Sequence, residues 1–189
     1  MKVHFFRHGI TIANEQMLYY GATDISLSQR GVDELKRLKN ETVLPDADFF
    51  ATSGLRRTKE TLRLLYDKEP NLKIPELNEF NFGDFEMKNY DQLRDDPGFI
   101  RWLSGGDDAM CPGGESNNQF AHRVKRGLKI VKEIKAENVA IVTHGGVIGI
   151  LMQMLFPQVH MNYYSWVPDC GHGYTVNFGD DAMTHTPIE

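Results

Sequence analysis

Two arginines and two histidines stand where apolar, strand-like segments give way to helical ones: Arg7, His8, Arg57 and His144. In open α/β sheets, ligands bind outside the carboxyl ends of the parallel strands, so these junctions converge if their strands are neighbours. The sequence therefore predicts a pocket of cationic and hydrogen-bonding groups at one edge of a sheet.

An anion is the natural ligand for such a pocket, and phosphate is the best candidate. The planar guanidinium of arginine meets phosphate oxygens through two parallel N–H bonds and stays charged at any working pH. Gly145 and Gly146 open the helical segment that follows His144, where they add backbone N–H groups and the positive end of a helix dipole. The pattern predicts phosphate binding.

The histidines suggest chemistry beyond binding. A neutral imidazole has a reference pKa of about 6.5, and cationic neighbours lower that pKa, so one ring nitrogen keeps its lone pair near neutral pH and can attack phosphorus. The second histidine and both arginines would then stabilise the charge on the equatorial oxygens in the transition state. The residues alone leave open which histidine attacks.

The segments that must hold these groups alternate between strand and helix patterns. Strands are predicted at residues 2–6, 47–52, 72–77, 138–143, 173–179 and 182–188, the last two joined by a tight Gly-Asp-Asp turn. Helices are predicted at residues 29–39 after a Ser28 cap, at 54–67, from the Ser116/Gln119 capping box to Ile134, and at 145–156 before Pro157. This alternation is typical of a three-layer α/β/α sandwich with a mostly parallel central sheet.

The length and a change of pattern set the predicted domain organisation. A chain of 189 residues suits one domain, residues 1–189. Between residues 80 and 115 the periodicity gives way to a segment rich in Gly, Asp and aromatic residues, with only short helical pieces expected near 89–103. We interpret residues 80–115 as a lid-like insertion over the active site.

The charge of the chain favours a small-molecule partner. The formal net charge is -5 and no basic run is present, which argues against binding to nucleic acid or to an anionic membrane. The apolar N-terminal patch is broken by Arg7 and His8, so we expect neither a signal peptide nor a membrane span there. The oligomeric state cannot be predicted.

The cysteines fit a reducing compartment and give no metal site. Cys111 and Cys170 are too few for a disulfide framework, so a cytoplasmic location is expected. The sequence Cys170-Gly171-His172 lacks the second Cys/His pair that a structural zinc site needs. We therefore expect neither a metal nor another cofactor.

Five phrases in this order resemble the histidine phosphatase superfamily, also called the phosphoglycerate mutase-like fold: FFRHGITIAN, SGLRRTKET, LNEFNFGDFE, PGGES and VTHGGVIGI. The resemblance runs from residue 3 to about residue 155. It implies the fold of that superfamily and a metal-free phosphomonoesterase that works through a phosphohistidine on the histidine of RHG.

The resemblance assigns a role to each matching residue. It implies that His8 is the nucleophile and that Glu79, in LNEFNFG, protonates the leaving oxygen and then activates water. The residues it implies as phosphate ligands are Arg7, Arg57, His144, Asn14, Gly21 and Gly145. In this reading Gly21 presents its backbone to the phosphate, and Arg57 binds phosphate where its neighbour Arg56 does not.

Departures from the pattern bear on the substrate. The mutases of the superfamily carry an arginine after the acidic residue, whereas Phe80 and Asn81 follow Glu79 here. The insertion is acidic where theirs is basic, which favours a monophosphatase. FGDFE, DPGFIRW and CPGGES resemble the α-ribazole phosphatase branch most, although Met87 replaces the usual glycine. Two alternatives stay open: a cofactor-dependent phosphoglycerate mutase and a non-enzymatic phosphate-binding relative.

Overall fold

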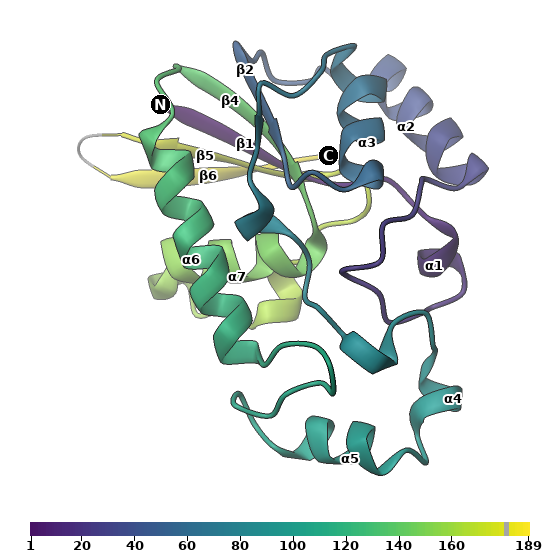
Figure 1. Ribbon diagram of the computed structural model, residues 1–189. Helices are drawn as coiled ribbons and strands as arrows, with labels where there is room; N and C mark the ends of the chain where they lie inside the picture. Colours follow the sequence, from purple (N-terminus) through teal and green to yellow (C-terminus); the bar gives the residue numbers. More distant parts are fainter. Residues whose placement is uncertain (180–181) are drawn as a thin grey trace.

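A single sheet of six strands organises the chain in the order β3-β2-β4-β1-β5-β6 (Figure 1). The computed structural model describes residues 1–179 and 182–189. The strands are β1 Lys2–Arg7, β2 Phe49–Thr52, β3 Leu72–Lys73, β4 Asn138–Thr143, β5 Gly173–Phe178 and β6 Met183–Ile188. The pairings among β1 to β4 are parallel, while β5 and β6 add antiparallel partners at one side. The predicted mostly parallel α/β sheet is confirmed.

Helices cover both faces of this sheet. The α-helices are α1 Ile12–Glu15, α2 Gln29–Glu41, α3 Arg56–Tyr66, α4 Tyr90–Leu93, α5 Pro97–Ser104, α6 Asn117–Glu133 and α7 Gly145–Leu155. Short 3-10 turns lie at η1 Pro75–Leu77, η2 Gly83–Phe85, η3 Pro157–Val159 and η4 Tyr163–Trp166. Helices α2 and α3 lie on one face and α6 and α7 on the other, which gives the three layers (Figure 1).

Alternating side chains of the central strands supply the two cores. In β1, Phe5 packs into the core on the α6–α7 face and Phe6 into the core on the α2–α3 face, and neither is exposed. In β4, Ile141 packs into the core on the α6–α7 face and Val142 into the core on the α2–α3 face. Such a strand is apolar on both sides, as expected for a parallel strand between two helical layers, and each buried phenylalanine contributes about 1.5–3 kcal/mol.

The predicted strands and helices are present with ends that move by one or two residues, apart from one segment that differs in kind. Ser28 caps α2, and Ser116 forms a capping box with Gln119 at the start of α6, both as expected. The segment predicted as extended at 72–77 is a strand only over Leu72–Lys73, because Pro75 cannot donate to a ladder and begins the turn η1. The predicted Gly-Asp-Asp turn includes Asp180 and Asp181, which lie outside the described residues.

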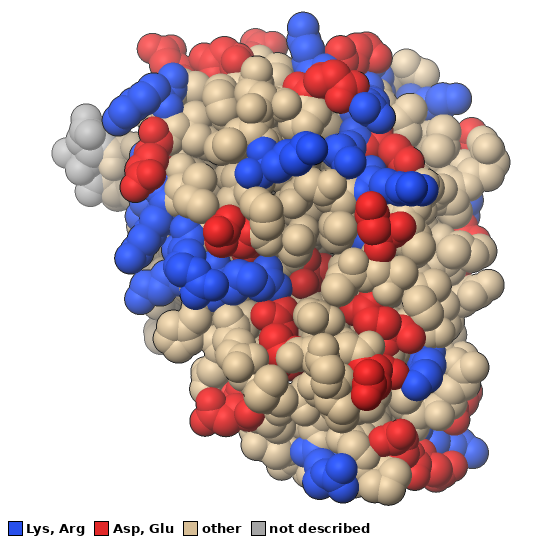
Figure 2. Space-filling model, viewed as in Figure 1, with Lys and Arg blue, Asp and Glu red and all other residues tan. Residues whose placement is uncertain are grey.

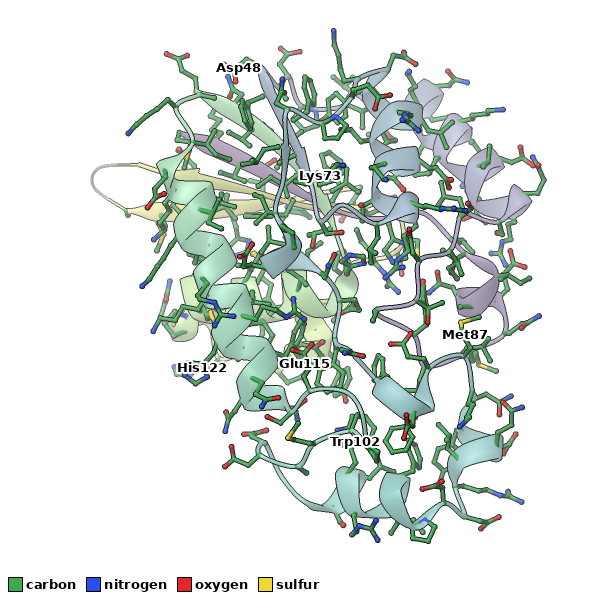
Figure 3. The ribbon with its side chains drawn as sticks, in the orientation of Figure 1. Asp48, Lys73, Met87, Trp102, Glu115 and His122 are labelled. Carbon is green, nitrogen blue, oxygen red and sulfur yellow. The ribbon has the colours of Figure 1, made fainter. Side chains whose placement is uncertain are left out.

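The segment between η1 and α6 stands apart from the sheet. Its helices α4 and α5 lie beyond the ends of the strands, at the bottom of Figure 1. Trp102 on α5 is turned toward the rest of the molecule (Figure 3) and packs among aromatic rings, with ring centroids 5.7–6.2 Å apart, from Tyr19, Phe80, Phe82, Phe85 and Phe99. The short helical pieces expected near 89–103 are therefore present as α4 and α5.

One face of the molecule carries a group of basic side chains. Figure 2 shows Lys and Arg side chains gathered over α6, where Lys125, Arg126, Lys129 and Lys132 are exposed. The linear sequence hides this grouping because apolar residues that face the core interrupt it. Among the described residues, no helix combines the length and the apolar composition needed to span a lipid bilayer.

Candidate active site

The ends of three neighbouring parallel strands bring the predicted groups to one edge of the sheet. Arg7 at the end of β1 pairs in register with Thr143 at the end of β4, and Thr52 of β2 pairs with Val142. The residues that follow these strands, His8, His144 and Ser53, are therefore adjacent. The predicted convergence of the strand-to-helix junctions follows from the strand order.

His8 is buried and holds its ring in a defined orientation. Its Nδ1 lies 2.7 Å from the carbonyl oxygen of Gly9, so Nδ1 carries the proton and Nε2 keeps its lone pair. Burial first, and then the charges of Arg57 and Arg7, hold the pKa of His8 well below 6.5. The imidazole is therefore neutral near pH 7, with Nε2 as its free nitrogen.

His144 lies against His8, with ring centroids 5.2 Å apart. It is fully buried, and burial and the charge of Arg57 hold its pKa well below 6.5 as well. Its Nε2 is 2.8 Å from Ser53 Oγ, whereas Nδ1 has no hydrogen-bond partner among the described residues. A buried nitrogen without a partner is costly, so a ligand that supplies one is favoured here.

The two arginines are held by backbone carbonyls and keep donors free. Arg7 donates from Nη1 to the carbonyl of Pro168 at 2.8 Å. Arg57 is fully buried and donates to the carbonyls of Thr23 and Gly21 at 2.8 and 2.7 Å. The Nε atoms of both arginines are buried and lack a partner among the described residues. A guanidinium has five N–H donors, so both arginines can still bind an anion.

Asn14 and Tyr20 form a polar group beside the free nitrogen of His8. The amide oxygen of Asn14 accepts from the Thr11 N–H, the Thr11 hydroxyl and the Tyr20 hydroxyl at 2.8–3.0 Å, which leaves its NH2 group to donate elsewhere. The Tyr20 hydroxyl lies 3.5 Å from His8 Nε2. Burial raises the pKa of Tyr20, so this hydroxyl stays protonated and keeps its bond to Asn14.

Glu79 meets the site from the segment after η1. Its carboxylate accepts two hydrogen bonds of 2.9 Å. One comes from the backbone N–H of Phe80 and the other from the N–H of Gly146 in the first turn of α7. A Cβ atom at Gly146 would lie only 2.3 Å from Glu79 Oε1 and 2.8 Å from the Tyr163 hydroxyl. The absence of a Cβ atom at position 146 therefore leaves space for the Glu79 carboxylate.

The two predicted backbone ligands differ in their surroundings. Gly145 lines the cavity beside Arg7, and a Cβ there would approach the Arg7 guanidinium to 3.2 Å. Gly21 does not line the cavity, because its N–H donates to both oxygens of Glu86 at 2.9 and 3.0 Å. The N–H of Gly21 is therefore taken by Glu86 and its carbonyl by Arg57, and its implied contact with phosphate stays a prediction.

Sequence reasoning missed a partly buried ion pair that supports Glu79. Arg123 on α6 pairs with Glu115 at 2.6 Å and donates to the carbonyls of Glu76, Asn78 and Glu79 at 2.7–3.0 Å. Figure 3 shows Glu115 beside the first turns of α6. One signal was present in the sequence, since Arg123 follows Phe120 by three residues and so falls on the buried side of the helix.

A cavity of about 720 Å³ opens beside these groups, whereas Arg57 and His144 are fully buried and are not among its lining residues. Arg7, His8, Asn14, Glu79 and Gly145 line its inner end. The outer walls are largely aromatic and polar, with side chains from Tyr19, Phe82, Trp102, Asp107, Asn117, Asn118, Phe120, Tyr163 and Tyr164. Among the lining residues that the structure describes, Arg7 is the only Lys or Arg. Within residues 1–179 and 182–189, no group of three or more His, Cys, Asp or Glu could hold a metal ion.

Known proteins match the chain over most of its length. A family model described as histidine phosphatase superfamily (branch 1) matches residues 3–183. The chain is 33% identical over 160 residues to the adenosylcobalamin/alpha-ribazole phosphatase of Escherichia coli strain K12, a match that covers 82% of this chain and 79% of that protein. It is 35% identical over 164 residues to a phosphoglycerate mutase of Schizosaccharomyces pombe, which covers 79% and 76% respectively.

A solved structure agrees with the fold. The alpha-ribazole phosphatase of Shigella flexneri superposes with a TM-score of 0.87 at 28% sequence identity, over 100% of this chain and 96% of that one. Overall identity does not separate the phosphatases from the mutases, because both kinds of relative lie near one third. The residues of the cavity must make that distinction.

Proposed function

The chain belongs to the histidine phosphatase superfamily and is a phosphatase, and from that premise we propose that it hydrolyses a small phosphomonoester through a phosphohistidine at His8. The orientation of the His8 ring carries this proposal. Its Nδ1 proton is held by the Gly9 carbonyl at 2.7 Å, so the lone pair of Nε2 is free beside the donors of the cavity. A histidine that served only to bind an anion would not need this tautomer.

In the first step, Nε2 of His8 attacks phosphorus and the bond to the ester oxygen breaks. Arg7, Arg57, His144 and the NH2 group of Asn14 would donate to the equatorial oxygens as their charge develops, the type of contact worth most in transition-state stabilisation. The unpartnered nitrogens of Arg7, Arg57 and His144 support these roles. The products of this step are phosphohistidine and the substrate alcohol.

Glu79 would supply the proton that the departing alcohol needs. Protonated Glu79 gives its proton to the leaving oxygen and becomes a carboxylate, which then takes a proton from water as the water attacks the phosphohistidine. Inorganic phosphate leaves, and both His8 and Glu79 return to their starting states. The position of Glu79 in the cavity lining, opposite the start of α7, supports this assignment.

The walls of the cavity favour α-ribazole 5'-phosphate, which would place the enzyme in cobalamin biosynthesis. The cavity volume suits a nucleoside-sized monophosphate, and its aromatic wall suits a planar ring. With Arg7 as the only Lys or Arg in the described lining, a second phosphate or a carboxylate would find no cation away from the phosphate end. The alpha-ribazole phosphatases among the relatives support the same substrate.

A cytoplasmic location and a small-molecule partner complete the proposal. Cys111 and Cys170 are both free in the structure, which is compatible with a reducing compartment. The sheet-edge cavity holds a ligand of limited size, and its lining is mostly aromatic and polar.

The test is phosphate release from a panel of monophosphates in the presence of a chelator, with His8→Ala alongside. The panel contains α-ribazole 5'-phosphate, 3-phosphoglycerate, nucleotides and sugar phosphates. We expect α-ribazole 5'-phosphate to be the best substrate, and we expect His8→Ala to lose several powers of ten in turnover while it still binds phosphate esters, because the arginines and His144 remain.

Each other outcome points to a defined alternative. Isomerisation of phosphoglycerates without net phosphate release would replace the proposed function with that of a mutase. Binding without turnover on any ester would identify a non-enzymatic relative. Turnover that survives in His8→Ala would contradict the phosphohistidine mechanism itself.

A further inference from the structure

The carboxylate of Glu86, just after η2, accepts hydrogen bonds mainly from the loop of residues 21–23. It accepts from the N–H groups of Gly21, Ala22 and Thr23 at 2.9–3.1 Å and from the Thr23 hydroxyl at 2.5 Å. A further N–H, from Phe82, donates to Oε1 at 3.1 Å. Among the described residues, no Lys or Arg forms a salt bridge with this carboxylate. The negative charge is therefore held by the loop.

The opposite side of the same loop holds Arg57. The carbonyl oxygens of Gly21 and Thr23 accept from Nη2 and Nη1 of Arg57 at 2.7 and 2.8 Å. These two bonds fix both ends of the guanidinium fork, and the ring of Tyr20 lies under it with the guanidinium carbon 4.9 Å from the ring centroid. The direction of the fork therefore depends on where the loop carbonyls lie.

One peptide group connects the two charges directly. The peptide between Gly21 and Ala22 donates its N–H to Glu86 at 3.0 Å and accepts from Arg57 at its C=O at 2.7 Å. In a trans peptide these two groups point in opposite directions, so the peptide dipole lies between a carboxylate and a guanidinium and is polarised by both. Moving the carboxylate would therefore move the carbonyl that orients Arg57.

The loop has little freedom to settle in another position. A Cβ atom at Gly21 would lie 1.7 Å from the carbonyl oxygen of Phe80, so the backbones of the two segments are in direct contact. Phe80 follows Glu79, so a shift of the loop would also press on the segment that carries the acid. A displacement of the loop would therefore disturb Arg57 and the Glu79 segment together.

We propose that Glu86 is a positioning residue for phosphoryl transfer, since its carboxylate fixes the Gly21–Thr23 loop whose carbonyls aim Arg57 at the phosphoryl oxygens. This inference rests on the proposed function, because it requires Arg57 to act on the phosphate. Glu86 itself touches neither the substrate nor His8.

The variant Glu86→Gln tests the proposal with little change in shape. The new amide NH2 would face backbone N–H donors, so the loop would shift and Arg57 would be misaligned. A displacement of this kind costs about 10–100-fold in kcat on an aryl phosphate, with a smaller change in KM. Thr23→Val removes only the 2.5 Å hydroxyl bond and should give a loss in the same direction but smaller.

A double-mutant cycle with Arg57→Ala separates positioning from general stability. If Glu86 acts through Arg57, Glu86→Gln should cost less than about threefold once Arg57 is absent, because the coupled effects are not additive. The matched control is Glu115→Gln, which removes the partner of Arg123 instead, and its cost should be the same with and without Arg57. Circular dichroism of each variant reports on folding, and if Glu86→Gln fails to fold, Thr23→Val takes its place in the cycle.

The outcomes separate the inference from the function on which it rests. Equal costs of Glu86→Gln in the presence and absence of Arg57 would overturn the positioning role while leaving the phosphatase mechanism intact. Full activity of Arg57→Ala alone would instead contradict the proposed site, and the role of Glu86 would fall with it.

Discussion

The two ends of the cavity are built in different ways. The inner end is formed by residues that directly follow paired strands, such as His8 after β1 and His144 after β4, and their ring nitrogens are fixed by Gly9 and Ser53. The outer end is lined by aromatic rings from several segments, and the rings between η1 and α6 form a cluster around Trp102.

The contrast indicates that the inner end carries out the chemistry and the outer end selects the substrate. Strand ends are held by the sheet ladder, so they can hold catalytic groups within the small tolerances that phosphoryl transfer requires. Rings in a segment outside the sheet present apolar area to a substrate without constraining the reacting atoms. Changes at the inner end should therefore affect bond breaking, and changes at the outer end should affect which ester is accepted.

Among changes at the inner end, Gly146→Ala should impair proton donation to the leaving group most selectively. The added Cβ would meet Glu79 Oε1 at 2.3 Å and displace the proposed acid. We expect a loss of about 100-fold on glycerol phosphate, whose alkoxide is a poor leaving group, and less than about tenfold on an aryl phosphate, whose leaving group barely needs a proton. Steady-state kcat values on the two esters measure the ratio.

A parallel variant checks the cause of that selectivity. Glu79→Gln removes the acid without adding an atom at the start of α7 and should give the same ratio between the two esters. Equal losses on both esters in either variant would remove Glu79 from the role of proton donor.

Trp102→Ala should alter the outer end without altering the chemistry. The indole packs against Phe80, Phe82 and Phe99, and its loss would remove the centre of the aromatic wall. We expect kcat/KM for α-ribazole 5'-phosphate to fall about tenfold, the value of one stacking contact, and that for glycerol phosphate to change less than about twofold. Equal losses on both substrates would show that the wall only stabilises the fold, and a thermal melt of the variant reports that loss separately.

The buried histidines predict a pH-dependent stability, to which His8 and His144 of the inner end contribute together with His4, whose pKa burial also lowers. The folded-state pKa values of His8 and His144 lie well below 6.5, so below pH 6.5 the unfolded chain binds more protons than the folded one. Stability is then lost as the pH falls, by about 1.4 kcal/mol per pH unit for each histidine until its folded pKa is reached. Urea denaturation between about pH 6.5 and 5.5 measures the slope. His144→Gln should lower the pH dependence of the unfolding free energy by the contribution of one histidine. An unchanged pH dependence would contradict the neutral state of His144.

Met87→Gly should give the smallest effect, in stability alone. Met87 lies at the edge of the molecule in Figure 3 and has a left-handed backbone with φ 60°, where a side chain costs about 1 kcal/mol. Compared with Met87→Ala, which keeps the strain, Met87→Gly should be more stable by about that amount at unchanged kcat. Thermal or urea unfolding of the two variants gives the difference, and a less stable glycine variant would contradict the strain.

The sequence predicted the inner end because local pattern and strand order are enough to place it. KVHFF and NVAIVT are apolar on both faces, as expected for central parallel strands, so the residues after them meet at one edge once the strands are neighbours, as β1 and β4 are. The caps at Ser28 and Ser116 are local signals of the same kind and were found where expected.

The contacts of loops could not be predicted in this way. Glu86 meets Gly21 across 65 positions of the chain, and nothing in the spacing of either residue indicates that the loop N–H groups would face a carboxylate. The pairing of Arg123 with the carbonyls before Glu79 depends likewise on how α6 packs on η1. Such partners follow from the packing of segments distant in sequence.

The most direct test of the account is to trap the phosphoryl group on the protein. Glu79→Gln should slow the hydrolysis of the intermediate, so after rapid mixing with an aryl phosphate and a quench in base, peptide mass spectrometry should find the phosphoryl group on His8. The adduct should be lost in acid, as a phosphohistidine is, and should be absent from Glu79→Gln carrying His8→Ala. A phosphoryl group on another residue, or turnover with no covalent phosphoprotein in that variant, would contradict the central claim.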